Sequence, residues 1–182
     1  MSDRYRNQYR IASTRLPGWD YASPGYYFVT LVTQGRTAWF GKITEGEMCL
    51  SEVGAIVRYE WLRIPAIRSN VTLDEWVIMP DHLHGIIVIH NVETPPHGTH
   101  PRTHSEGGVS TPWKPGTLGV IINHFKSRCT KSMRGAGCND FAWQSRFYER
   151  ILRDENALQN VRANIRANPA MRANDMETQS EN

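Results

Sequence analysis

The feature that most constrains the fold is a pair of strand-like segments joined by a short turn. Residues 71–79 alternate between apolar and polar side chains, which is typical of a half-buried strand. Residues 83–89 form a nearly continuous apolar run, which predicts a strand at the centre of a sheet. Alternate residues of a strand face the same way, so His82 and His84 are expected on one face and Leu83 on the other.

The two histidines are the first candidates for chemistry in the chain. Two imidazoles side by side make half of a divalent-metal site, because neutral imidazole is a common metal ligand. His-x-His is a short pattern, however, and two unrelated histidines at the end of a strand would give the same sequence. Asp81 precedes the pair, and we expect its side chain to face away from both histidines if the strand begins there.

The remaining periodic segments predict an alternation of strands and helices. Further strands are expected at residues 26–33, 47–50 and 147–152. Helices are expected from the cap Ser51 to Pro65, from Thr117 to the glycines at 135–137, and from the cap Asp154 to about Asn168, before Pro169. The order β-β-α-β-β-α-β-α predicts an α+β fold in which helices pack on a ferredoxin-like antiparallel sheet.

The length of 182 residues fits one domain, which we expect to span residues 1–170. Residues 90–115 are rich in Pro, Gly, Thr, Ser and His, which predicts a flexible loop. Its histidines at 97, 100 and 104 could form a metal tract, but the composition favours plain disorder. The polar residues 171–182 predict a disordered tail.

The cysteine content and the hydropathy of the chain indicate in which cellular compartment the protein is expected. Cys49, Cys129 and Cys138 are odd in number and widely spaced, which indicates reduced thiols rather than a disulfide framework or a zinc knuckle. The Arg-rich start has no apolar signal segment, and no apolar run approaches the roughly 18 residues of a membrane span. We therefore expect a cytoplasmic protein with no membrane partner.

Positive charge is clustered although the net charge is only +3, with a pI near 8.9. An N-terminal arm carries Arg4, Arg6, Arg10 and Arg15, and the second predicted helix carries Lys126, Arg128, Lys131 and Arg134. Aromatic residues are interleaved with the arginines of the arm, so the arm offers phosphate contacts and stacking surfaces for nucleic acid. A disordered tail and a solvated helix face are the alternatives.

Several motifs then occur in a fixed order along the chain. They are Tyr26-Tyr27-Phe28-Val29-Thr30, Phe40-Gly41, residues 79–85 (MPDHLHG), residues 125–127 (FKS), residues 143–149 (WQSRFYE), residues 151–155 (ILRDE) and Asn168-Pro169. From about residue 4 to residue 170 the chain resembles the single-tyrosine HUH transposases, and within them the REP-associated tyrosine transposases.

This resemblance implies a ferredoxin-like (RRM-like) domain with the HUH histidines on a central strand. It implies that His82, His84 and Asn168 hold a Mg²⁺ or Mn²⁺ ion, which polarises a phosphate of single-stranded DNA. It also implies that a tyrosine on the final helix attacks that phosphate, with no nucleotide cofactor. The expected partners are hairpins formed by palindromic repeats, with Lys126 as a phosphate contact, and the protein would act as a monomer or a homodimer.

The sequence departs from this pattern at the nucleophile. The tyrosine position, one helical turn before the metal-ligand asparagine, is occupied by Asn164. An amide cannot attack phosphorus, and residues 154–169 contain no Tyr, Ser, Thr or Cys. Tyr148, in the preceding strand, is a less favoured substitute, and an edge or core aromatic is the better interpretation of it.

Three hypotheses therefore stay open. The chain is a DNA-cleaving transposase, a hairpin-binding protein on the same scaffold that no longer cleaves, or a metal-dependent hydrolase that uses water. The last is the least favoured, because Asp81 is the nearest general base and is expected to face away from the histidines.

Overall fold

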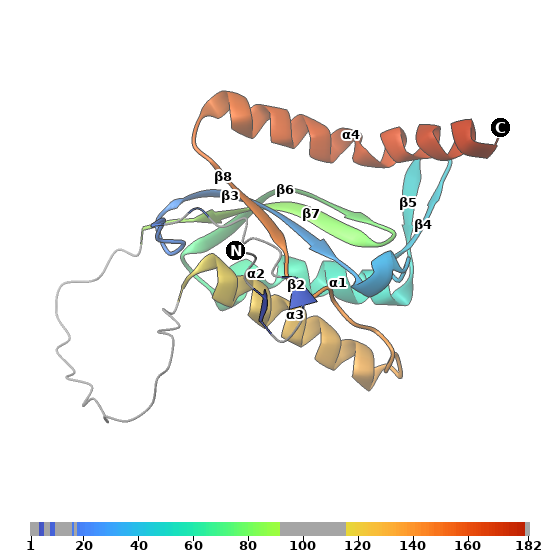
Figure 1. Ribbon diagram of the computed structural model, residues 1–182, viewed down its shortest axis with the longest axis horizontal. Coiled ribbons are helices and arrows are strands. Elements are labelled where there is room, and N and C mark those ends of the chain that lie inside the picture. Colours follow the sequence, from blue (N-terminus) through green and yellow to red (C-terminus); the bar gives the residue numbers. More distant parts are fainter. Residues whose placement is uncertain (1–3, 6–7, 10–15, 17, 92–115, 181–182) are drawn as a thin grey trace.

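A four-stranded antiparallel sheet forms the centre of the molecule (Figure 1). The structure is a computed structural model that describes residues 4–5, 8–9, 16, 18–91 and 116–180, with side chains at 16, 18–91 and 116–170. The strands are β3 Gly25–Val32, β6 Val71–Met79, β7 His82–Ile89 and β8 Tyr148–Leu152, in the order β6-β7-β3-β8. This order, with helical segments between β3 and β6 and again between β7 and β8, is ferredoxin-like, so the predicted fold class is confirmed.

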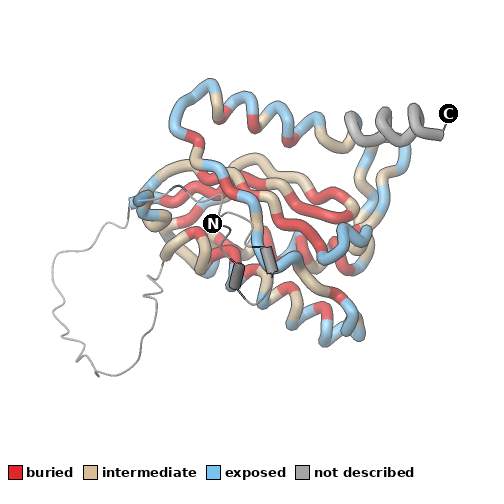
Figure 2. The backbone as a smooth tube through the Cα atoms, in the orientation of Figure 1, coloured by how far each residue is buried: buried red, intermediate tan, exposed pale blue. Residues whose placement is uncertain are grey.

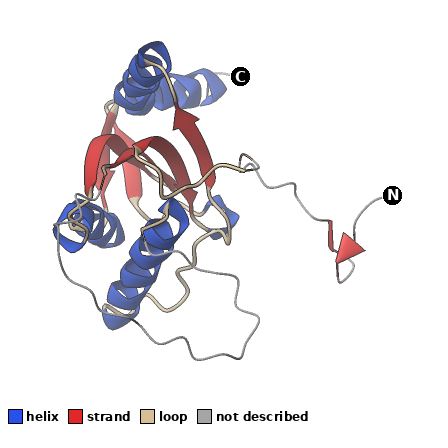
Figure 3. Cartoon of the chain, turned by 90° about the vertical axis from the view of Figure 1, so that its left-hand side faces the viewer, coloured by secondary structure: helices blue, strands red, loops and turns tan. Residues whose placement is uncertain are grey.

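Helices cover both faces of the sheet. One face carries α1 Glu52–Leu62, the short α2 Ile64–Ile67 and α3 Leu118–Gly135, and the other face carries α4 Glu155–Ser180. The turned view in Figure 3 separates the three layers, with α4 on one side of the strands and α1 and α3 on the other. None of the described helices is long and apolar enough to cross a membrane.

The larger of two hydrophobic cores lies between the sheet and α1 and α3. Its members include the fully buried Trp61 on α1 and Leu83 and Ile87 on β7, and the Trp61 and Phe125 rings meet edge to face at 5.3 Å. Gly85 is part of this contact, because a Cβ there would lie 2.4 Å from Trp61 Cζ2. Figure 2 shows that the buried backbone is concentrated in the strands of the sheet and in the helix sides next to it. Leu83, Ile87 and Ile89 of the apolar run are therefore buried on this face, and β7 is an inner strand of the sheet, as the sequence predicted.

A smaller core lies under α4. It consists of Ile86, Leu152, Leu158, Val161 and Ile165, with Tyr26, Phe28, Val77 and Ala157 packed around it. Leu158, Val161 and Ile165 follow the helical spacing that the sequence predicted for a buried stripe. This core is a strip along one side of α4, and over residues 155–170 the outer side of the helix is exposed (Figure 2).

The elements differ from the sequence-based expectation at three main places. β4 Gly41–Thr44 was not predicted, and it pairs with β5 Glu47–Leu50 in a separate hairpin because its partner lies just across a tight turn. α1 ends at Leu62 rather than at Pro65, which lies instead in the first turn of α2, where its missing N–H is not needed. The predicted helix end at Asn168 is wrong, because α4 continues through Pro169 to Ser180. Ala, Met and Arg follow the proline, and their high helix propensity opposes the loss of one hydrogen bond.

Two small parts complete the description. β1 Arg4–Tyr5 and β2 Gln8–Tyr9 pair with each other near the N-terminus. The loop predicted at 90–115 falls, from residue 92 on, outside the described residues.

Candidate functional site

His82 and His84 lie side by side at the start of β7, an inner strand of the sheet. Their ring centroids are 4.5 Å apart and their planes are inclined at 71°. His82 faces Val32 and Met79 across the neighbouring strands, and His84 faces Thr30 and Val77. His82 is buried and His84 is half-buried. The alternation of the strand thus brings both imidazoles to the α4 face, as expected.

Each histidine is anchored through its Nδ1 atom. His82 Nδ1 lies 2.7 Å from Asp81 Oδ1, and His84 Nδ1 lies 2.9 Å from Thr30 Oγ1. A partner at Nδ1 fixes the ring orientation and makes Nε2 the atom that can bind a metal. The expectation that Asp81 faces away is wrong, because Asp81 lies in the β6–β7 turn, where strand alternation does not apply.

Arg36 extends this network to the surface. Its Nη1 lies 3.2 Å from Asp81 Oδ2, while its own side chain is 69% exposed. The η1 turn, Gln34–Arg36, presents it there with a positive φ of 54°. Sequence reasoning missed Arg36 and Thr30 because their partners lie 45 and 54 residues away along the chain.

The environment of His84 favours the neutral ring. Burial, followed by the nearby charge of His82, lowers the pKa of His84 to about 4. Phe28 stacks on it with ring centroids 5.5 Å apart. A neutral imidazole keeps the lone pair that a metal ion needs.

Tyr148 lies in the same row of the sheet as His84. Thr30 of β3 pairs with His84 on one side and with Tyr148 on the other, so all three side chains point to the α4 face. Tyr148 meets the Phe28 ring edge to face at 6.2 Å and is 47% exposed. Tyr148 is thus an exposed aromatic of the edge strand β8.

Asn164 and Asn168 are carried across the histidine face by α4. Ile165, between them, belongs to the small core with Ile86 and Val77, which neighbour His84 on β7 and β6. Asn168, one turn beyond Ile165 on the same side, is half-buried, whereas Asn164 is exposed. Asn168 is therefore on the side of α4 that packs towards the sheet.

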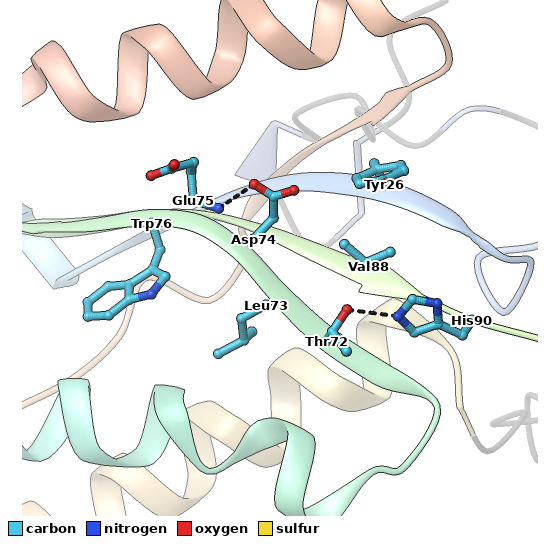
Figure 4. Close-up of a pocket in the computed structure, with 8 residues that line it drawn as sticks. All are labelled: Tyr26, Thr72, Leu73, Asp74, Glu75, Trp76, Val88 and His90. Carbon is cyan, nitrogen blue, oxygen red and sulfur yellow. Dashed lines mark hydrogen bonds between the residues drawn. The ribbon is translucent and has the colours of Figure 1, made fainter.

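Two arginine–carboxylate pairs fix α4 on the sheet. The pairing of β6 shifts register between Leu73 and Trp76, and this bulge turns two consecutive carboxylates, Asp74 and Glu75, towards α4 (Figure 4). Arg162 Nε donates to Asp74 Oδ1 at 2.9 Å, and Arg166 Nε donates to Glu75 Oε1 at 2.9 Å. The Arg162 guanidinium holds the pKa of Asp74 below its usual range.

A hollow of about 510 Å³ lies beside this bulge, and Figure 4 shows the side chains that line it. It is lined by Tyr26, Thr72, Leu73, Asp74, Glu75, Trp76, Val88 and His90. Thr72 Oγ1 lies 2.7 Å from His90 Nε2. The hollow lies at the end of β7 opposite the His82–His84 pair, so it is separate from the candidate metal site.

The basic residues that were expected to contact DNA lie in different surroundings, and some of them fall outside the described residues. Arg6, Arg10 and Arg15 fall outside the described residues, and of Arg4 only the backbone in β1 is described. Lys126 donates to the carbonyls of Gln144 and Arg146 at 2.8 and 3.3 Å, and burial lowers its pKa to about 8. Arg128 pairs at 2.7 Å with the buried Glu60. Lys131 is exposed on the outer side of α3.

The chemistry of the donors is consistent with a hard divalent ion. Within the described part of the chain, no group of three His, Cys, Asp or Glu side chains is placed to hold a metal. Asn168 lies on the side of α4 that packs towards the sheet, and its amide group could supply an oxygen ligand beside the two histidines. Two imidazoles with one oxygen suit Mg²⁺ or Mn²⁺ better than a thiolate-loving metal.

Comparisons with known proteins show one related sequence and one shared fold. A curated relative from Haemophilus influenzae, described only as an uncharacterized protein, is 34% identical over 163 residues, covering 87% of this chain and 88% of the relative. A solved REP-associated tyrosine transposase bound to a REP hairpin superposes with a TM-score of 0.58 and 17% identity, over 89% of this chain and 74% of that one. No family model matches the chain. At this identity the solved structure establishes a shared fold.

Proposed function

The chain belongs to the family of the Haemophilus influenzae protein, and from this premise we propose that it acts on single-stranded DNA hairpins in the manner of a REP-associated tyrosine transposase. The observation that carries the proposal is the anchored histidine pair, set on an inner strand of the fold that a hairpin-bound transposase shares. If the two histidines served only to stabilise the fold, two adjacent imidazoles on one face of the sheet, each held through Nδ1, would not be required.

In this proposal His82, His84 and Asn168 hold Mg²⁺ or Mn²⁺. When bound, such an ion would polarise a phosphate of the DNA and stabilise the leaving oxygen. Asp81 and Thr30 position the two imidazoles, and Arg36 neutralises the Asp81 carboxylate while its exposed side reaches solvent. The arginine pairs attach the helix that carries Asn168 to strand β6.

The proposed function has two forms, which differ in whether the protein supplies a nucleophile that cuts the DNA strand. Asn164 occupies the tyrosine position and is exposed on α4, and an amide cannot form a phosphodiester bond. This observation favours a second candidate function, in which the protein binds hairpins and the metal without cutting the strand. Tyr148 supports the cleaving form, because it shares the row of His84 and is exposed.

A covalent-adduct assay tests the proposal. End-labelled palindromic hairpins from DNA that flanks the gene are mixed with Mn²⁺ and the protein, and adducts are resolved on a denaturing gel. The variants are Asn164→Tyr, Tyr148→Phe and Asn164→Tyr combined with His82→Ala. We expect an adduct with Asn164→Tyr, and none when His82→Ala is added.

Other outcomes identify the alternatives. An adduct with the unaltered protein that Tyr148→Phe abolishes would assign the attack to Tyr148. Nicked DNA with neither end attached to protein would indicate water as the nucleophile. Failure of the unaltered protein to retard any hairpin in a native gel would contradict the proposal itself.

A further inference from the structure

A hollow of about 500 Å³ lies between helix α3 and the segment 141–145. From α3, the side chains of Lys126, Lys131 and Arg134 line it. Its volume is in the range of small-molecule sites. Because α3 packs on the sheet face opposite to α4, the hollow is separate from the candidate metal site, and the proposed function gives it no role.

The side-chain nitrogen of Lys126 is held in the wall of this hollow. Its Nζ donates to the carbonyl oxygen of Gln144 at 2.8 Å and to that of Arg146 at 3.3 Å, and it lies 5.7 Å from the centre of the Trp143 ring. A lysine nitrogen has three positions besides its carbon. Two N–H bonds serve the two carbonyls, so the third position holds either a proton or, in the neutral amine, the lone pair. The fold therefore orients the electron pair that makes the amine a nucleophile.

Burial also increases the neutral fraction of this half-buried amine. It lowers the pKa of Lys126 from 10.5 to about 8. Among the described residues that line the hollow, the other charged side chains are Lys131 and Arg134, and none is acidic. Asp140 and Arg146, on either side of the segment 141–145, are exposed. A desolvated lysine near other cations is the kind that reacts as a nucleophile.

The two exposed cations determine the charge of a suitable reagent. Lys131 and Arg134 lie within about two helical turns of Lys126 along α3. Their charges attract an anion, and the same lining includes the hydroxyl groups of Ser127 and Thr130. An electrophile whose leaving group is a phosphate would therefore be concentrated beside the Lys126 amine.

We propose that Lys126 is an acylation site for small acyl phosphates, which Lys131 and Arg134 hold in the hollow. The lone pair of Nζ attacks the acyl carbon and forms a C–N bond. The bond from that carbon to the phosphate oxygen breaks, and the phosphate leaves with the electron pair and takes up the proton that the amine loses. The product is an uncharged amide with one N–H, which can serve only one of the two carbonyls. The inference does not depend on the proposed function, because it uses no residue of the candidate metal site.

The test compares the acetylation rates of individual lysines in the full chain. The protein is incubated with acetyl phosphate between about pH 7 and pH 10, and acetylation is followed by mass spectrometry of its peptides. Lys42 and Lys131 are exposed and provide internal references for Lys126. The same reaction in guanidinium chloride, which unfolds the chain, measures the reactivity of Lys126 without the hollow.

At about pH 8, roughly half of the Lys126 amines are neutral, against roughly 0.3% for a lysine with the ordinary pKa of 10.5. Partial burial and the lower basicity of the amine offset part of this advantage. We therefore expect Lys126 to react about 10-fold faster than Lys42 in the folded protein. The rate of Lys126 should level off above about pH 8, whereas that of Lys42 should keep rising. The difference should vanish in guanidinium chloride.

A second comparison tests whether the cations hold the phosphate. Lys131→Ala combined with Arg134→Ala should slow the reaction of Lys126 with acetyl phosphate about fivefold, and leave its reaction with uncharged acetic anhydride within about twofold. The control is Arg58→Ala combined with Arg150→Ala, which removes the same charge from exposed positions outside the lining. This control should match the unaltered protein with both reagents. Circular dichroism checks that both variants fold.

A rate at Lys126 no higher than that at Lys42 in the folded protein would overturn the inference. An advantage that persists in guanidinium chloride would also overturn it, because the local sequence rather than the hollow would then be the cause. The same holds if the double variant reacts with acetyl phosphate as fast as the unaltered protein, or is slowed equally with both reagents. None of these outcomes affects hairpin binding, so the proposed function would stand.

Discussion

The two faces of the sheet are built in different ways. The face under α1 and α3 is closed by large apolar side chains, with the Glu60–Arg128 ion pair beside them. The face under α4 has a narrow apolar strip, and polar groups flank it: the anchored histidines at one end and two arginine–carboxylate pairs along β6. The face under α1 and α3 contributes most of the apolar core. The face under α4 carries the residues of the candidate site and has a smaller core.

The largest effect is expected on the apolar face. Trp61→Ala removes a fully buried ring from the contact with Phe125 and Gly85. We expect the free energy of unfolding to fall by about 3–5 kcal/mol, because the cavity adds to the lost burial. Urea denaturation followed by circular dichroism measures it. Ile165→Ala, on the α4 face, is the matched comparison, and a loss as large as that of Trp61→Ala would contradict the difference between the faces.

A pH effect of intermediate size is expected from Lys126. Burial lowers its pKa from 10.5 to about 8, so the unfolded chain binds more protons between these values and stability should rise with pH there. Relative to Lys126→Met, the unaltered protein should gain up to about 3 kcal/mol between pH 7 and pH 10. Urea titrations of both proteins across this range provide the measurement. A difference that stays flat with pH would show that the ammonium is well solvated.

The effect of a bound metal ion on stability should depend only on residues of the sheet face under α4. We expect Mn²⁺ to stabilise the unaltered protein by about 2.7 kcal/mol at a hundred times its dissociation constant. His82→Ala should remove this gain, and Asn168→Ala should reduce it. Thermal melts with and without Mn²⁺ measure both effects, and the exposed His124→Ala is the matched control. Equal stabilisation of all four proteins would rule out the site.

The smallest effect is expected from the pairing of α4 with β6. The lowered pKa of Asp74, caused mainly by Arg162, means that this pair stabilises the fold above the ordinary carboxyl pKa of 3.8. The contribution should be lost as the pH falls through the lowered value. A double-mutant cycle with Asp74→Asn and Arg162→Gln at pH 6 and at low pH measures the coupling. Coupling that persists in acid would point to packing rather than charge.

Much of this fold could be predicted from local patterns. The alternation in residues 71–79 and the apolar run 83–89 gave β6 and β7, and their faces followed from the same period. The helical spacing of Leu158, Val161 and Ile165 gave the buried side of α4. The bulge at Asp74 and Glu75 could not be predicted, because a single extra residue in a strand leaves no distinct local signal.

For the candidate site, the sequence by itself determined the residue types and their spacing: His82 and His84 on one strand face, Asn164 and Asn168 one helical turn apart, and the absence of a nucleophile between residues 154 and 169. Only the tertiary structure decided that Asp81 and Thr30 anchor the rings, that Tyr148 shares the row of His84, and that Lys126 and Arg128 have internal partners. The physical reason is that spacing along a strand or helix is fixed by backbone geometry, whereas these contacts depend on how separate elements pair and pack.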